Sequence, residues 1–185
     1  MAFCFVLNTR YLVPQLKLIM LKKIFLSLLI TSSVYVASAQ ASVDFSSIKL
    51  EQKSDYAPAE ATVLKVADYI LSTPADKNSL DRIKSMQFLM KWMEGTPDYQ
   101  FPIGHQIVKA SNNNPDLLGV YLAAITKFSL ENKDQSKDHK VVMLNGFKQF
   151  LTYCFNRSNN VKTNATIKKY KAAEEKGELE KVLEL

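Results

Sequence analysis

Residues 117–130 constrain the fold most, because this segment is apolar on nearly every side when it is wound as a helix. Its apolar residues are Leu117, Leu118, Val120, Tyr121, Leu122, Ala123, Ala124, Ile125 and Phe128. The preceding Asn114, Pro115 and Asp116 form a helix start, in which asparagine caps, proline fits the first position and aspartate favours the helix dipole. A helix with so little polar surface belongs at the centre of a bundle, and at this length it is too short to span a membrane.

Other segments have narrower apolar stripes at helical spacing, which indicates helices with one buried face. We expect these helices over residues 59–72, 80–94, 138–156 and 164–176, with a short helix near 104–110. The segment 80–94 carries a stripe of Ile83, Met86, Met90 and Met93, which Leu89 and Trp92 widen. The sequence therefore predicts an all-α fold, a single compact bundle of about five mostly antiparallel helices over residues 57–185 after a polar lead-in over residues 40–56.

The N-terminal part has the pattern of a secretory signal peptide. Residues 20–23 are Met-Leu-Lys-Lys, residues 24–36 are mostly apolar, and residues 37–39 are Ala-Ser-Ala, directly ahead of Gln40. A basic start, an apolar middle and a small-residue exit predict export, with cleavage between Ala39 and Gln40. The mature protein is therefore expected to be periplasmic or secreted.

Two features of this N-terminal part leave alternatives open. Residues 1–39 read as an upstream segment plus the signal peptide, with translation starting at Met20. An uncleaved membrane anchor is the rival interpretation. The apolar run of about 13 residues is shorter than the ~20 needed to cross a bilayer as a helix, so cleavage is the preferred prediction.

Charge is nearly balanced once the signal peptide is removed. The chain has 24 Lys+Arg and 18 Asp+Glu, and four of the bases but none of the acids precede Gln40. The mature part then has 20 basic and 18 acidic residues, a net charge of +2, with the two signs interspersed. A nucleic-acid binder needs a basic patch, so we predict no nucleic-acid partner. We expect a monomer without a stable membrane span after cleavage, whose partner is another envelope or extracellular protein.

Catalytic and metal-binding patterns are missing from the mature sequence. His105, His139 and Cys154 have no partner at ligand spacing, so we expect neither a metal nor a cofactor. Cys154 lies 15 residues after His139 on one expected helix. At 1.5 Å per residue the two are about 22 Å apart and cannot form a nucleophile–base pair. Cys154 is expected to be a small core residue, and the protein is not expected to be an enzyme.

The stretch most typical of a binding site is the connection over residues 92–105, which holds Trp92, Tyr99, Phe101 and His105. Aromatic side chains on a proline-stiffened loop offer contact area to a partner. The favoured function is a protein- or peptide-interaction module that uses this loop. Two alternatives stay open: the rings pack the loop back over the core, or Met86, Met90 and Met93 line a pocket that carries an apolar small molecule.

The leader and the stretch Lys91-Trp92-Met93-Glu94-Gly95-Thr96-Pro97-Asp98-Tyr99 resemble small exported helical proteins of unassigned function from Gram-negative bacteria. This resemblance implies export and an all-helical domain. It implies no activity and no site residues.

Overall fold

The computed structural model describes residues 43–185, so the expected signal peptide, its cleavage site and the start at Met20 lie outside the described residues. The described part contains seven α-helices, two short 3-10 helices and no strand. The α-helices are α2 (Tyr56–Ser72), α3 (Leu80–Gly95), α4 (His105–Ser111), α5 (Pro115–Glu131), α6 (His139–Phe155), α7 (Ala165–Glu175) and α8 (Leu179–Val182). The 3-10 helices are η1 (Lys53–Asp55) and η2 (Arg157–Asn159).

The all-α bundle is confirmed, with seven helices in the described part rather than about five. The short helix expected near residues 104–110 is present as α4, and the C-terminal residues form the additional short helix α8. α8 is formed because Leu179 and Leu183 are buried, although four residues are too few for a stable isolated helix. No helix among residues 43–185 is both long and apolar enough to cross a membrane.

Helix starts follow the capping residues of the sequence. Asn114 accepts the backbone N–H of Asp116, and proline occupies the first turn of α5, as predicted. Ser79 accepts the backbone N–H of Arg82 at the start of α3, and Asp138 accepts those of the first turn of α6. These short polar side chains satisfy N–H groups that have no partner inside the helix.

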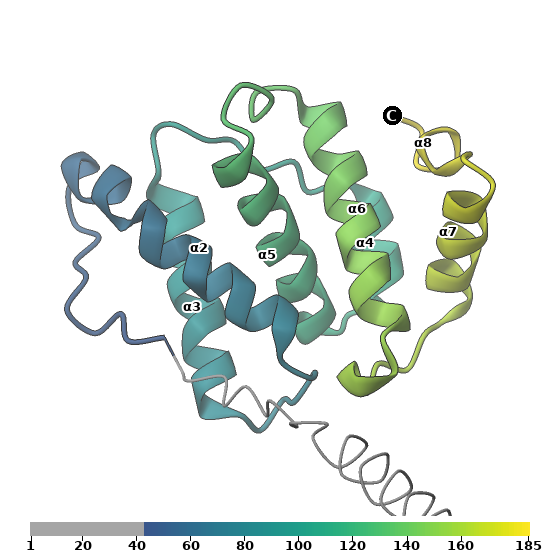
Figure 1. The fold of residues 1–185 in the computed structure, drawn as a ribbon, viewed down its shortest axis with the longest axis horizontal. Coiled ribbons are helices and arrows are strands. Elements are labelled where there is room, and N and C mark those ends of the chain that lie inside the picture. Colours follow the sequence, from purple (N-terminus) through teal and green to yellow (C-terminus); the bar gives the residue numbers. More distant parts are fainter. Residues whose placement is uncertain (1–42) are drawn as a thin grey trace, which may run out of the picture. The chain divides into compact units, whose positions relative to one another are not determined.

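The central position predicted for α5 is confirmed. Eleven of its 17 residues are buried, and it contacts α2, α6, α4 and α3. Figure 1 shows α5 between α2 and α6, with α4 behind α6. Close approach of α5 and α6 depends on Gly146, because a Cβ there would come within 2.3 Å of Ile125 Cγ2.

The orientation of α3 differs from the expected one. Its buried residues are Arg82, Ser85, Phe88, Leu89 and Trp92, whereas Met86 and Met93 are only partly buried and Ile83 and Met90 are exposed. The methionine stripe therefore lies at the edge of the core. The reason is Arg82, which is only 1% exposed and is drawn inward by its hydrogen-bond partners.

Arg82 connects four helices through its guanidinium group. Nε donates to Asp116 Oδ1 on α5 over 2.7 Å, and Nη2 donates to the hydroxyl of Tyr153 on α6 over 3.1 Å. Nη1 donates to the carbonyls of Ile70 and Thr73 and to Thr73 Oγ1, over 2.8, 3.2 and 2.8 Å. The terminal carbonyls of α2 are thus satisfied by a charged side chain from α3, which fixes the rotation of α3 about its axis.

Candidate functional site

An apolar groove runs along the exposed edge of α3. It consists of two adjoining hollows that share Met90 and Leu122, and we call them together the methionine groove. The upper hollow, of about 350 Å³, is lined by Met93, Thr96, Tyr99, Phe101 and Ile103 together with the shared residues. The lower hollow, of about 320 Å³, is lined by Ile83, Met86, Pro115, Leu118 and Gly119 together with the shared residues, and by the polar residues Asp76, Lys77, Arg82, Gln87 and Asp116.

The wall opposite α3 is supplied by α5. Pro115, Leu118, Gly119 and Leu122 recur at i, i+3, i+4 and i+7, so they lie on one face of that helix. Gly119 forms the floor, since a Cβ there would lie 2.7 Å from the sulfur of Met86. Large apolar side chains remain accessible along the groove: Ile83 is 38% exposed, Met90 44% and Ile103 55%.

The upper hollow is closed on one side by residues 97–103, which we call the strap. Tyr99 is buried and Phe101 partly buried, and their rings lie 5.7 and 6.0 Å from the fully buried ring of Trp92. Trp92 Nε1 donates to the carbonyl of Tyr56, which anchors the indole to α2. The alternative in which the aromatic residues pack back over the core describes their position, although Tyr99 and Phe101 still line the hollow.

Few contacts of the main chain hold the strap. Its backbone groups form no backbone–backbone hydrogen bond with other described residues. The Tyr121 hydroxyl donates to the carbonyl of Pro102 over 3.1 Å, and the Tyr99 hydroxyl donates to Glu60 Oε1 over 3.1 Å. Apart from its covalent ends, the strap is therefore held by ring packing and by two hydrogen bonds from tyrosine hydroxyls, and not by a backbone ladder.

Glu60 on α2 joins the strap to the loop before α6. Its second oxygen, Oε2, accepts a hydrogen bond from Lys133 Nζ over 2.6 Å. Burial, with a further contribution from Glu60, raises the pKa of Tyr99, and the hydrogen bond to Glu60 raises the pKa of Lys133. Both shifts extend to higher pH the range in which the Tyr99 hydroxyl and the Lys133 ammonium hold the protons that they donate.

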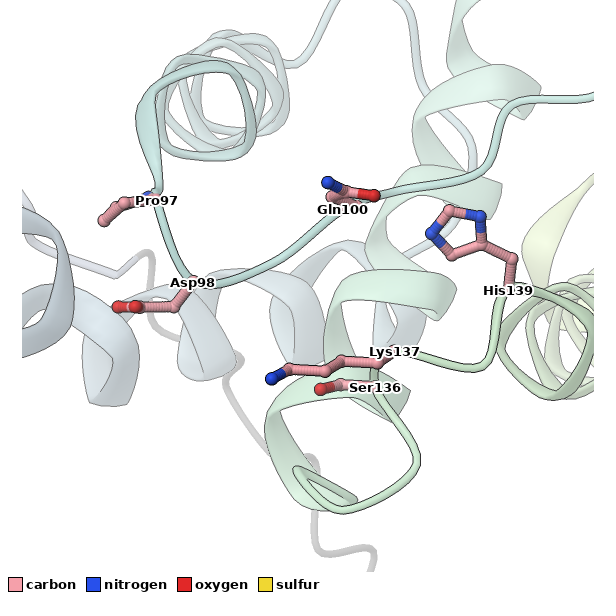
Figure 2. A pocket seen from close by; sticks show the side chains of 6 residues that line it. All are labelled: Pro97, Asp98, Gln100, Ser136, Lys137 and His139. Atoms are coloured by element: carbon pink, nitrogen blue, oxygen red, sulfur yellow. The ribbon is translucent and has the colours of Figure 1, made fainter.

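A polar hollow of about 350 Å³ lies on the other side of the strap. Figure 2 shows Pro97, Asp98 and Gln100 of the strap on one side, and Ser136, Lys137 and His139 on the other. Gln100 borders both this hollow and the upper hollow, so the strap is the partition between an apolar and a polar space. Within the described part of the chain, neither Asp98 nor Lys137 forms an ion pair.

The predicted site residues are brought together in part. Trp92, Tyr99 and Phe101 form one aromatic cluster, and Met90 and Met93 line the hollow beside it. Met86 lies in the lower hollow. His105 is exposed at the start of α4 and lines none of these hollows.

Cys154 is 3% exposed, and burial raises the pKa of its thiol to about 12. At neutral pH the thiol therefore stays protonated and is a poor nucleophile, as expected of a core residue. Among residues 43–185 no cluster of three His, Cys, Asp or Glu side chains could hold a metal ion.

The sequence does not indicate the four groove residues of α5, which are Pro115, Leu118, Gly119 and Leu122. Nothing distinguishes them in a helix that is apolar all round, because the sequence does not show which face is covered. The role of Arg82 was not predicted either. Ser85, Leu89 and Trp92 follow it by three, seven and ten residues, a spacing that indicates one helix face.

No protein-family model, no curated protein and no solved structure matches this chain.

Proposed function

We propose that this protein is a peptide-binding interaction module whose site is the methionine groove rather than the aromatic loop alone. The observation that carries the proposal is the pair of adjoining apolar hollows between α3 and α5, bordered by accessible Ile83, Met90 and Ile103. Exposed apolar grooves of this kind are typical of interaction sites.

The shape favours a peptide helix as occupant. Ile83 and Met93 are ten residues apart on α3, so at 1.5 Å per residue the groove follows about 15 Å of helix. Two hollows in a row along this length accommodate apolar side chains spaced i, i+3 or i+4, and i+7 on a bound helix. Methionine side chains are flexible and polarizable, so they adapt to different partner side chains.

A carrier of an apolar small molecule is the second candidate. It is favoured by the volumes of the hollows, about 350 and 320 Å³, which lie at the lower end of the range for small-molecule sites. In this case one compact ligand would fill one hollow beside Met90. Native mass spectrometry of the purified protein would detect it as a constant added mass.

The proposed setting is the periplasm or the outside of the cell, with an envelope or extracellular protein as the source of the peptide. This part of the proposal is supported by the signal-peptide pattern over residues 20–40. N-terminal sequencing of the protein recovered from the envelope or medium should find Gln40 or a residue close to it. Recovery of the soluble protein with Met20 at its N-terminus would contradict export by cleavage.

Selection of displayed peptides on the immobilised protein tests the function. We expect enriched peptides with apolar residues at i, i+3 or i+4, and i+7, and we expect Met90→Glu to weaken their binding by at least about tenfold, because a carboxylate enters both hollows. Met90 is 44% exposed, so the substitution should leave the fold intact. Lys148→Glu, at an exposed position on α6, is the control for charge, since it makes the net charge more negative by two units against one unit for Met90→Glu.

Two results would contradict the proposal. One is that no peptide sequence is enriched over the unmodified surface. The other is that the selected peptides bind the Met90→Glu variant and the Lys148→Glu control equally well.

A further inference from the structure

The strap separates an apolar hollow from a polar one, and its attachment is unlike that of the neighbouring elements. Each α-helix around it is held by its own backbone ladder, whereas residues 97–103 rely on the two tyrosine hydroxyls of Tyr99 and Tyr121 and on ring packing. We propose that the strap is a hinged wall of the binding site and that Glu60, through its hydrogen bond with Tyr99, is the latch that holds it closed. The purpose of this device rests on the proposed function.

The latch is positioned to control the strap from outside the groove. Glu60 is on α2, does not line either hollow of the groove, and has a side chain that is 19% exposed. Its two oxygens are shared between Tyr99 of the strap and Lys133 of the loop that borders the polar hollow. Loss of the hydrogen bonds to Glu60 therefore frees the strap from α2 and, in the same step, frees the loop that contains Lys133 from α2.

A buried polar atom marks where the strap would open. Thr96 directly precedes the strap and lines the upper hollow, and its Oγ1 is buried without a hydrogen-bond partner in the described part of the chain. Buried hydroxyls are normally paired, so this unpaired one destabilises the closed position of the strap; of the four unpaired buried side-chain atoms in the described part, it is the one that lines the upper hollow. Movement of the strap would expose this hydroxyl to a bound peptide.

Opening would also join two spaces of different character. The upper hollow is apolar, while Asp98, Lys137 and His139 line the polar hollow beyond Gln100. The joined space suits an amphipathic peptide that places an apolar side chain beside Met90 and a charged side chain across the strap. We therefore expect the partner to be a helical peptide that carries a charged residue next to its apolar face, and not any apolar helix.

Trp92 reports the strap directly, because it is the only tryptophan of the chain and is covered by Tyr99 and Phe101. The experiment compares acrylamide quenching of its fluorescence in the parent and in Tyr99→Phe, which loses only the hydroxyl that binds Glu60. We expect the quenching constant to rise about threefold or more, because the loosened strap uncovers the indole more often. Tyr170→Phe, which removes a hydroxyl far along the chain on α7, should leave quenching unchanged.

Glu60→Ala removes the same hydrogen bond from the other side and leaves all aromatic side chains unchanged. Hydrogen exchange of the Trp92 indole N–H, which donates to the Tyr56 carbonyl beneath the strap, should accelerate in both variants, while the amides of α5 stay protected. Unchanged quenching and unchanged exchange in both variants would overturn the latch. These readouts need no peptide, so a failure of the strap is distinguishable from a failure of the proposed function.

Discussion

Replacement of Arg82 by methionine tests how the fold positions the groove. Methionine retains the length and packing of the arginine stem but removes the guanidinium. The loss leaves Asp116, whose side chain is 14% exposed, without its cationic partner. It also leaves the carbonyls of Ile70 and Thr73 without the donor that joins them to α3.

The expected cost follows from these partners. Removing one member of a buried ion pair costs about 3–5 kcal/mol, because the remaining charge is buried without compensation. Arg82→Lys keeps the charge, but an ammonium cannot reproduce the planar fork that serves three helices at once. We expect it to cost about 2 kcal/mol, the scale of one or two lost hydrogen bonds to a charged group.

Urea unfolding followed by Trp92 fluorescence measures both changes, with Lys84→Met as the control at an exposed position on the same helix. The control should stay within about 0.5 kcal/mol of the parent, as surface substitutions usually do. The double variant of Arg82→Met with Asp116→Asn should be more stable than the sum of the single changes predicts, since the uncompensated charge is gone. If Arg82→Met unfolds within 1 kcal/mol of the parent (a typical single-substitution effect), the guanidinium does not hold α3 in place.

Two further predictions concern the core. Gly146→Ala should destabilise the protein by about 1–3 kcal/mol, because its Cβ meets the branched side chain of Ile125, whereas Gly119→Ala should cost less than about 1 kcal/mol, because it displaces only the flexible end of Met86 and alanine favours the helix. Equal costs in urea unfolding would contradict this account of the two glycines. Burial raises the pKa of Cys154 from 9.0 to about 12, so its contribution to stability is complete below pH 9 and is lost as the pH rises, by about 1.4 kcal/mol per pH unit. Between pH 9 and pH 10 the free energy of unfolding should fall by about 1 kcal/mol more in the parent than in Cys154→Ala, while the buried tyrosines, whose pKa values are also raised, lower it in both. An identical fall in both would show that the thiol is not buried in its neutral form.

The elements of this fold could be predicted where one residue type decides the local structure. Asn114 and Pro115 have the same role in any helix start, and α5 is apolar on so many sides that only a central position satisfies it. The aromatic rings of the strap show the limit of such reasoning. A sequence places Tyr99 and Phe101 after a turn, but only the tertiary structure decides whether the turn directs them to solvent or back to Trp92.

Only the α3 side of the groove could be predicted from the sequence. The methionine stripe of α3 is visible in the sequence, yet apolar periodicity alone assigns it to the core. Arg82 reverses this assignment, because its partners on α2, α5 and α6 meet only in the folded protein and their hydrogen bonds outweigh the burial of flexible methionines. The groove is thus accessible because Arg82 is buried, whereas a hydropathy pattern predicts that an arginine lies at the surface.

Methionine-methyl NMR tests the central claim most directly, since the binding site has its own methionines. Of the six methionines in the chain, Met86, Met90 and Met93 line the groove, while Met143 lies on α6 and serves as an internal control. Titration with a selected peptide should shift or broaden the three groove signals in proportion to occupancy and leave the Met143 signal in place. A titration in which the groove methyl signals do not move while the peptide binds, or in which Met143 responds as strongly as Met90, would contradict the groove as the binding site.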